Sequence, residues 1–257
     1  MEEAFPYIKE DQRIQFPGED DIDESGIAGV GGNLSPGVLL SAYEQGLFPW
    51  YGPDEPIIWW NPAERAVFLP GKLHISQSMK RFLNRTNLTV TFNQDFRSVI
   101  SACREIERPG QDGTWITDEM LEAYCNLHRL GYAHSVEVWD TDDTSEKPAG
   151  GLVGEPVGGL VGEPVGEPVG EPVGEPVGGP VGGLYGLQLG TAFFGESMFS
   201  RVPNASKTAL IILYRHLMDL GMTMIDCQVM NNHLASLGAV EISRSEYMKL
   251  LQTALGN

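Results

Sequence analysis

Apolar residues along the chain fall into short groups, and the residues at the ends of each group indicate where helices start and stop. Ser35 followed by Pro36 supplies an N-cap and a first helical residue, and Gly46 ends that segment. Ser243 with Glu246 has the spacing of a capping box and predicts a last helix. Similar signals predict further helices over residues 76–84, 93–107, 117–131, 204 or 206 to 220, and 231–237.

Between these helices lie short runs of β-branched and aromatic residues bounded by turn residues, which is typical of strands. Three of them, 134–139, 184–189 and 192–194, are expected to form an antiparallel meander. Helices around a mixed sheet indicate the α/β or α+β class. The remaining strands are expected over residues 57–60, 66–69, 88–92 and 222–229.

A low-complexity tract interrupts this pattern between residues 150 and 185. It consists of nine tetrapeptides of the forms GGLV, GEPV, GGPV and GGLY, and it contains 13 of the 31 glycines and 6 of the 17 prolines. Such a composition disfavours a helix and a central strand, because glycine recurs in every unit and proline in six of the nine. The tract therefore predicts a flexible loop, partly in the polyproline II conformation, at about 150–183 and within the first connection of the meander.

Composition narrows the class of protein. The apolar fraction of 42% and charged fraction of 20% are those of a globular chain. No run of about 18 apolar residues occurs, and the acidic N-terminus lacks the apolar core of a secretory signal. Three scattered cysteines exclude a disulfide scaffold and a four-cysteine zinc site, which favours a reduced, cytoplasmic location.

The net charge of −18 is unevenly distributed. Residues 1–26 and 150–185 together carry −12, whereas the interval from Arg65 to Gln94 contains five bases and no acid. A stretch of this kind is either a solvated face or a local site for a polyanion such as RNA. Both interpretations remain open on the residues alone. The five bases are Arg65, Lys72, Lys80, Arg81 and Arg85.

Asp226 and Gln228 form the first candidate for chemistry. They lie in the expected strand 222–229, two residues apart, so both should point to the same face. A carboxylate at the end of an apolar strand needs a partner, because burial of an unpaired charge is costly. Asp226 either caps the helix that begins near Asn231 or orients Gln228 toward an attacking amine.

Glu196 and the tryptophans are further candidates. Glu196 follows an apolar strand behind a glycine, and it either pairs with Arg201 or recognises a cationic or amino group. Trp50, the Trp59–Trp60 pair and Trp115 stand beside proline, glycine or polar residues, so each either fills a core or stacks on a base or ribose.

Several common sites are not supported by the sequence. His74 and His134 lack metal-ligand spacing, so we expect them to be structural and predict no metal site. Cys227 is expected to be a core residue. The phosphate-binding, dinucleotide-binding and hydrolase motifs GxxxxGK[ST], GxGxxG and GxSxG do not occur.

Taken together, nine motifs resemble the leucyl/phenylalanyl-tRNA–protein transferases. The resemblance covers roughly residues 28–149 and 182–255 and does not include the tetrapeptide repeat. In chain order the motifs are Gly31–Pro36 (GGNLSP), Gly46–Trp50 (GLFPW), Trp59–Pro62 (WWNP), Ser78–Phe82 (SMKRF), Gly113–Thr117 (GTWIT), His134–Trp139 (HSVEVW), Gly195–Ser200 (GESMFS), Asn204–Ala209 (NASKTA) and Ile225–Gln228 (IDCQ).

The resemblance implies a reaction and an organisation. Such enzymes move leucine or phenylalanine from aminoacyl-tRNA to the N-terminal Arg or Lys of a protein, which marks it for N-degron proteolysis. The implied fold is α+β, with an acidic segment over 1–27, a small N-terminal domain over 28–72, and an acetyltransferase-like (GNAT) domain over 73–257. The resemblance implies no cofactor and no membrane, and a monomer is expected.

The resemblance also assigns residues by their motif positions. Asp226 and Gln228 match the catalytic pair, and Glu196 matches an acid near the aminoacyl ester and the acceptor. Glu196 is also the best candidate for selecting the cationic acceptor. The positions that match the 3′-adenosine contacts are Trp50 and Trp115, those that match the apolar donor pocket are Leu184, Phe193, Leu210, Leu213 and Ile225, and those in the tRNA-binding patch are Lys80, Arg81 and Arg85.

This chemistry is consistent with the residues present. The donor is an activated ester, and the α-amine that attacks it has a pKa of about 7.7–8.0, so a nearby carboxylate need assist only a modest deprotonation. An apolar pocket separates similar side chains by only about 1–3 kcal/mol, so methionine should be transferred weakly.

Two alternative functions remain. One is an acyl-CoA N-acyltransferase, although the glycine-rich pyrophosphate loop of that class is missing from residues 201–206. The other is an inactive, tRNA-binding member of the family.

Overall fold

The computed structural model describes residues 11–18, 21–106, 114–140 and 179–256. Most of the tetrapeptide repeat and of its predicted loop lies outside these residues, as do residues 1–10 and 19–20 of the predicted acidic segment. In the part of the chain that is described, no helix is long and apolar enough to cross a membrane.

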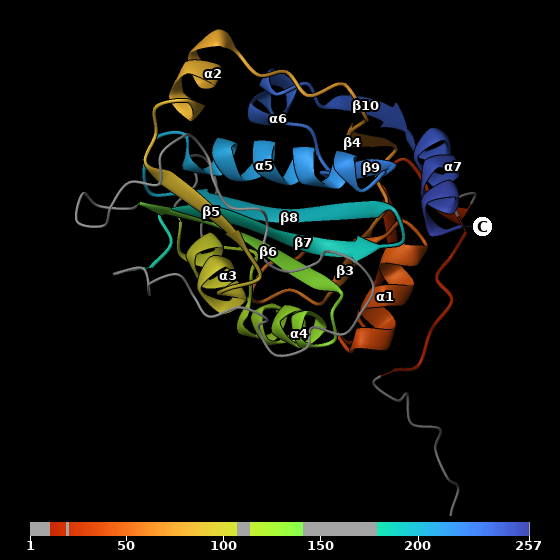
Figure 1. The fold of residues 1–257 in the computed structure, drawn as a ribbon. Coiled ribbons are helices and arrows are strands. Elements are labelled where there is room, and N and C mark those ends of the chain that lie inside the picture. Colours follow the sequence, from red (N-terminus) through yellow and green to blue (C-terminus); the bar gives the residue numbers. More distant parts are fainter. Residues whose placement is uncertain (1–10, 19–20, 107–113, 141–178, 257) are drawn as a thin grey trace, which may run out of the picture.

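Two sheets form the frame of the molecule (Figure 1). A small antiparallel sheet has the order β1-β3-β2, and a seven-stranded mixed sheet has the order β10-β4-β9-β8-β7-β6-β5. The small sheet consists of β1 (Ile27–Val30), β2 (Phe48–Pro49) and β3 (Ile58–Trp60). The large sheet consists of β4 (Glu64–Phe68), β5 (Leu88–Phe92), β6 (Ala133–Asp140), β7 (Gly182–Leu189), β8 (Ala192–Ser200), β9 (Met224–Asp226) and β10 (Val240–Ser243).

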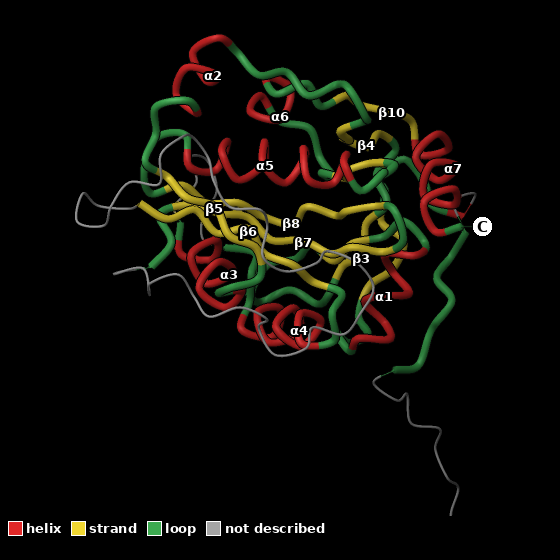
Figure 2. Tube along the Cα trace, in the orientation of Figure 1, coloured by secondary structure: helices red, strands yellow, loops and turns green. Residues whose placement is uncertain are grey.

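Helices cover both faces of the large sheet, as Figure 2 shows. The long helix α5 crosses one face, with α2 and α6 beyond it, and α1, α3 and α4 lie on the opposite side. The helices are α1 (Pro36–Glu44), α2 (Gln77–Leu83), α3 (Phe96–Glu105), α4 (Asp118–Arg129), α5 (Ala205–Asp219), α6 (Asn232–Ser236) and α7 (Arg244–Leu255). This arrangement confirms the α+β class.

Each face of the large sheet has its own apolar core. Alternation along β7 and β8 sends Leu184 and Phe193 toward α5, whereas Tyr185 and Phe194 enter the core with α1, α3 and α4. This second core also contains Trp59 of the small sheet. The two sheets are therefore packed together through one set of buried side chains.

The predicted boundary at residue 72 differs from the sheet arrangement. Strand β4 lies within the predicted small domain, but it pairs with β9 and β10 of the large sheet. The small sheet ends with β3 at Trp60. No local pattern marks this change of sheet, because both strands flank the same Asn61–Pro62 turn.

The predicted meander β6-β7-β8 is confirmed, but its middle strand starts earlier than expected. Gly182 and Gly183, from the last tetrapeptide, belong to β7, a central strand. A Cβ atom on Gly183 would lie 2.5 Å from the carbonyl oxygen of Val136. The glycine that argued against a strand is thus required here by the close approach of the neighbouring backbone.

Helix caps were predicted with mixed success. Thr117 caps α4 through the backbone N–H of Met120, and Ser243 with Glu246 forms the expected capping box. Helix α3 begins later than the predicted start at residue 93: its cap is Asp95, which accepts from the backbone N–H of Ser98. Asn93 instead adopts a φ of 59° and accepts a hydrogen bond from the backbone of Ser135.

Candidate active site

Glu196 lies at an irregularity in the middle of β8, not after a strand as predicted. In the β7–β8 ladder, Tyr185 pairs with Ser197 and Gly186 pairs with Gly195, so Glu196 is an extra residue without a partner. Such a β-bulge redirects one side chain and is frequent beside active sites. The bulge therefore explains how Glu196 leaves the regular alternation of the strand.

The neighbouring strand β9 stays beside β8 for only a short distance. The two strands are parallel and pair from Ala192 with Met224 to Phe194 with Asp226. Beyond Phe194 the ladder between them ends, although β8 continues to Ser200 against β7. Glu196, Asp226 and Gln228 all lie at this point of divergence.

Asp226 is enclosed in a polar box beneath the site. Its side chain is 0% exposed, as is that of Arg65 on β4. Arg65 donates through Nε to Oδ1 at 2.9 Å and through Nη2 to Oδ2 at 2.7 Å. Tyr247 of α7 donates to Oδ2 at 2.9 Å. A bidentate pair with an added hydroxyl donor is among the strongest ways to hold a buried carboxylate.

Arg65 is held as firmly as its partner. Its guanidinium stacks between the rings of Phe48 and Tyr247, with Cζ at 4.7 Å and 4.4 Å from the ring centroids, and Nη1 donates to the carbonyl oxygen of Gly46 at 3.0 Å. Burial opposes the charged form, but the Asp226 carboxylate outweighs it and raises the pKa of Arg65. Arg65 is therefore a structural cation of the centre and not part of a tRNA-facing stretch.

Gln228 follows the end of β9 in a left-handed conformation, with a φ of 57°. Asp226 Oδ1 accepts a hydrogen bond from the backbone N–H of Gln228 at 2.8 Å, which stabilises this turn. The side-chain amide donates instead to Glu196 Oε1 at 2.9 Å. Strained backbone of this kind persists only where the surroundings determine it. The predicted proximity of Asp226 and Gln228 is present, but it arises from a turn and not from strand alternation.

Two tyrosines complete the surroundings of Glu196. The hydroxyl of Tyr124, on α4, donates to Glu196 Oε2 at 3.1 Å, and the hydroxyl of Tyr43, on α1, lies 2.5 Å from that of Tyr124. Burial raises the pKa of Glu196 to about 7, although the tyrosine hydroxyls oppose this rise. A carboxyl group with this pKa can exchange a proton near neutrality.

The structure decides between the alternatives left open for the two acids. Asp226 does not cap α6, because the side chain of Asn231 accepts from the backbone N–H of Leu234. Arg201 does not pair with Glu196: among the described residues its ion pair, at 3.9 Å, is with Glu105. The sequence analysis missed four contributors, Tyr43, Arg65, Tyr124 and Tyr247. Of these four residues, only Arg65 had a sequence signal, because it is one of the five bases of the stretch from Arg65 to Gln94.

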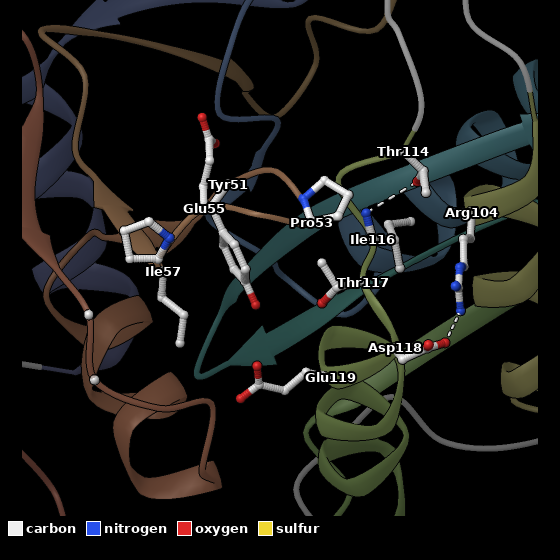
Figure 3. Close-up of a pocket in the computed structure, with 13 residues that line it drawn as sticks. Tyr51, Pro53, Glu55, Ile57, Arg104, Thr114, Ile116, Thr117, Asp118 and Glu119 are labelled. Atoms are coloured by element: carbon white, nitrogen blue, oxygen red, sulfur yellow. Dashed lines mark hydrogen bonds and ion pairs between the residues drawn. The ribbon is translucent and has the colours of Figure 1, made fainter.

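A cavity of about 590 Å³ opens between the loop after β2 and the start of α4 (Figure 3). Tyr51, which follows Trp50, lines it, and so do Thr114 and Ile116, which flank Trp115. Trp50 is 43% exposed, and Trp115 is half-buried. The segments that carry both predicted adenosine contacts therefore border one cavity. Its wall also contains Glu55, Arg104, Asp118 and Glu119.

The five predicted donor-pocket residues are brought together where α5 packs on the large sheet. All belong to one apolar cluster, and each is at most 3% exposed. None of them lines the cavity described above. They are Leu184, Phe193, Leu210, Leu213 and Ile225.

Three of the predicted tRNA-binding bases lie on or directly after α2. Lys80, Arg81 and Arg85 are exposed, and none has an ion pair among the described residues. A second cavity, of about 270 Å³, lies beside them and is lined by residues that include His74 and Lys207. Cationic side chains thus gather at this end of the molecule.

The remaining predictions concern metals and single residues. Among the described residues, no group of three His, Cys, Asp or Glu side chains could hold a metal ion. His134 is buried and lies 3.1 Å from the side-chain amide of Asn93, and burial lowers its pKa to about 4. Cys227 is half-buried against the α5-side core, and burial raises its pKa. The burial of His134 and the packing of Cys227 agree with the structural roles expected for these two residues.

The fold brings a carboxylate and an amide together at the divergence of two parallel strands, an arrangement compatible with a group-transfer enzyme. Comparison with known sequences shows which family of enzymes the chain belongs to. The C-terminal and N-terminal regions match two family profiles, described as "Leucyl/phenylalanyl-tRNA protein transferase" over residues 67–165 and 178–252 and as its N-terminal domain over residues 32–63. The chain belongs to the leucyl/phenylalanyl-tRNA–protein transferase family.

Individual relatives cover nearly the whole chain. The leucyl/phenylalanyl-tRNA–protein transferase of Syntrophus aciditrophicus is 46% identical over 94% of this chain and 86% of its own length. Those of Flavobacterium johnsoniae and Escherichia coli are each 44% identical, over 93% and 95% of this chain and 95% and 88% of their own lengths. The family match omits only residues 166–177 of the repeat, a narrower gap than the sequence analysis expected.

Proposed function

We propose that the protein transfers leucine or phenylalanine, and more weakly methionine, from aminoacyl-tRNA to the N-terminal Arg or Lys of acceptor proteins. The observation that carries the proposal is the bond between Gln228 Nε2 and Glu196 Oε1 at the divergence of β8 and β9. It places an amide and a half-buried carboxylate where an amine and an ester could meet. The product would carry a destabilising N-terminus for N-degron proteolysis.

The donor would occupy two neighbouring regions. Trp50 and Trp115 would hold the 3′-terminal adenosine beside the larger cavity, and ring stacking on a base contributes about 1–3 kcal/mol. The apolar cluster under α5 would receive the donor side chain after local opening, since its members are packed together. Selectivity for leucine and phenylalanine would then depend on apolar fit, which discriminates weakly between similar side chains. The members of that cluster proposed to contact the donor are Leu184, Phe193, Leu210, Leu213 and Ile225.

The tRNA body would extend from this centre toward α2. Lys80, Arg81 and Arg85 are exposed there, with Lys207 beside them on the second cavity. Phosphate contacts by such side chains give affinity that falls with salt and carries little sequence preference. This local cationic surface would overcome the net charge of −18.

Catalysis in this proposal comes mainly from positioning. An aminoacyl ester is already activated, so bringing the amine to it in the correct orientation accounts for most of the acceleration. Gln228 would bind the amine, Glu196 would lie beside its proton, and Asp226 would hold Gln228 in place through the backbone. Glu196 is also the nearest acid proposed to favour a cationic acceptor.

Transfer of radiolabelled leucine from leucyl-tRNA to a peptide that begins with Arg tests the proposal, with an otherwise identical Ala peptide as the control. Label on the Arg peptide alone would support both the reaction and the acceptor rule. Bound tRNA without transfer would favour the inactive tRNA-binding alternative. Transfer of an acetyl group from acetyl-CoA would favour an acyl-CoA N-acyltransferase.

We also propose, on the strength of the family resemblance, that the large sheet with its helices is an acetyltransferase-like (GNAT) fold. The parallel β8–β9 pair, with α5 as the connection between them, is compatible with it. A cytoplasmic monomer is proposed in addition, because charged tRNA is a cytoplasmic donor. Sedimentation of the purified chain would test the monomer.

A further inference from the structure

The two carboxylates of the centre differ in how completely their oxygens are occupied. Each oxygen of Asp226 accepts at least two hydrogen bonds: Oδ1 from Arg65 Nε and the Gln228 backbone, and Oδ2 from Arg65 Nη2, from the Tyr247 hydroxyl and, at 3.2 Å, from Arg65 Nε as well. A carboxylate has about four lone-pair positions, so none remains for an additional proton. With its side chain 0% exposed, Asp226 also has no path to a substrate.

Glu196 has the opposite properties. Its side chain is half-buried, and Oε1 and Oε2 each accept one bond, from Gln228 and Tyr124 respectively. About half of its lone-pair positions therefore remain open. The bulge in β8 directs this side chain toward Gln228, the residue proposed to bind the amine.

We propose that Glu196 is the residue that takes the proton from the attacking amine, and that Tyr124 and Tyr43 are positioning residues which hold its carboxylate. Asp226 is then a positioning residue as well, fixed by Arg65 and acting through the Gln228 turn. This assignment rests on the proposed transfer reaction and adds the division of labour within it.

The proton transfer balances without a cofactor. The neutral amine nitrogen attacks the ester carbonyl carbon, a C–N bond forms, and the positively charged nitrogen gives one proton to the Glu196 carboxylate. The C–O bond to the terminal ribose then breaks, and its electron pair stays on the ribose oxygen. Glu196 returns the proton to that oxygen, so the enzyme ends in its starting state and the products are an amide and an alcohol.

Charged and titratable groups face Glu196 from four elements: Tyr43 of α1, Arg65 of β4, Tyr124 of α4 and Asp226 of β9. Burial and the Asp226 charge raise the pKa of Glu196, whereas both tyrosine hydroxyls and Arg65 lower it, and the balance is about 7. A free α-amine has a pKa of about 7.7–8.0, so a Glu196 carboxylate with a pKa near 7 can accept the proton of the attacking nitrogen without a large cost in free energy.

The test is the pH dependence of turnover at saturating donor and acceptor, measured between pH 5.5 and 8.5 with the same Arg peptide for every variant. The turnover of wild type should fall as pH drops below about 7, and this fall is the acid limb of its pH profile. In the Glu196→Gln variant, the fall of turnover near pH 7 that comes from the enzyme should disappear, and turnover should be at least a hundredfold lower than in wild type.

Tyr124→Phe removes a donor from the ionised carboxylate, which should shift the acid limb by about one unit toward alkaline pH, so turnover should fall more at pH 7 than at pH 8.5. Tyr132→Phe is the matched control, because this half-buried tyrosine lies beyond the end of α4 and away from Glu196; its limb should not move. A merely structural role for Tyr124 would lower turnover equally at every pH.

The outcomes distinguish a failure of the proposed transfer reaction from a failure of the role assigned to Glu196. A wild-type enzyme that transfers nothing to either peptide contradicts the proposed function. A wild-type enzyme that transfers normally, with a Glu196→Gln variant that keeps the wild-type profile, overturns only the assignment of Glu196. If Glu196→Gln does not fold, as judged by its melting curve, the Tyr124→Phe profile decides: an unmoved limb rejects the proposal.

Discussion

Replacing Arg65 by methionine should be among the most destabilising single changes in this protein. The substitution keeps much of the apolar stem but leaves the Asp226 carboxylate buried without its bidentate partner. Breaking a fully buried ion pair from one side costs about 3–5 kcal/mol. Loss of the bond to the carbonyl oxygen of Gly46 and of stacking on two rings acts in the same direction.

Thermal unfolding at pH 7 measures this effect. For a chain of this size, each kcal/mol corresponds to about 2–4 °C, so Arg65→Met should lower Tm by about 6–20 °C. Arg97→Met is the matched control. Arg97 lies 2.6 Å from Glu122, almost the same distance as in the Arg65–Asp226 pair, but both side chains are 63% exposed. An exposed pair contributes about 0–1 kcal/mol, so Tm should hardly change.

A double-mutant cycle tests the reasoning itself. Arg65→Met combined with Asp226→Leu removes both charges and replaces them with apolar groups, which is often far less costly than breaking the pair. The double variant should therefore be more stable than the sum of the two single effects predicts, by at least about 2 kcal/mol. Additive single effects would refute the view that Asp226 needs Arg65 as its countercharge.

Four further predictions follow from the structure. Gly183→Ala should destabilise the protein by at least about 2 kcal/mol in thermal melts, because the new methyl group would overlap the neighbouring strand; a wild-type Tm would show that β7 can move away. Lys80→Ala with Arg81→Ala should weaken tRNA binding and reduce the slope of log affinity against log salt by about two, and an unchanged slope would mean a solvated face. Removal of residues 162–177, four whole units of the repeat, should leave transfer unchanged if the tract is a passive loop. Since the raised pKa of Glu196 means that the folded state holds a proton longer than the unfolded state, the contribution of Glu196 to stability should fall as pH rises from about 4.5 to about 7, and wild type should lose stability relative to Glu196→Gln in denaturation curves over this range.

Much of the fold could be predicted because local signals and final structure agree. Ser35–Pro36, Thr117 and the Ser243–Glu246 box mark helix starts that α1, α4 and α7 use. The strand β5 was predicted over its full extent. These signals depend on nearby residues alone, so they are readable without knowledge of the tertiary structure.

The parts that could not be predicted depend on contacts distant in sequence. Arg65 and Asp226 are 161 residues apart, and nothing in the local pattern pairs them. The bulge at Glu196 arises from the register between β7 and β8, and the left-handed turn at Gln228 from its bond to Asp226. The site residues were found from their motifs, whereas the geometry that gives them separate roles required the assembled sheet.

The start of β7 has a consequence for how the gene can vary. The strand begins with Gly182-Gly183-Leu184-Tyr185, and the repeat before it is a series of near copies of this unit. Each copy is a whole number of codons, so slippage during replication keeps the reading frame. Four is also an even number of residues, so a copy that replaced the strand start would present its side chains to the same faces of the sheet. Lineages of this gene should therefore differ in length here by multiples of four residues, while the sheet itself stays constant.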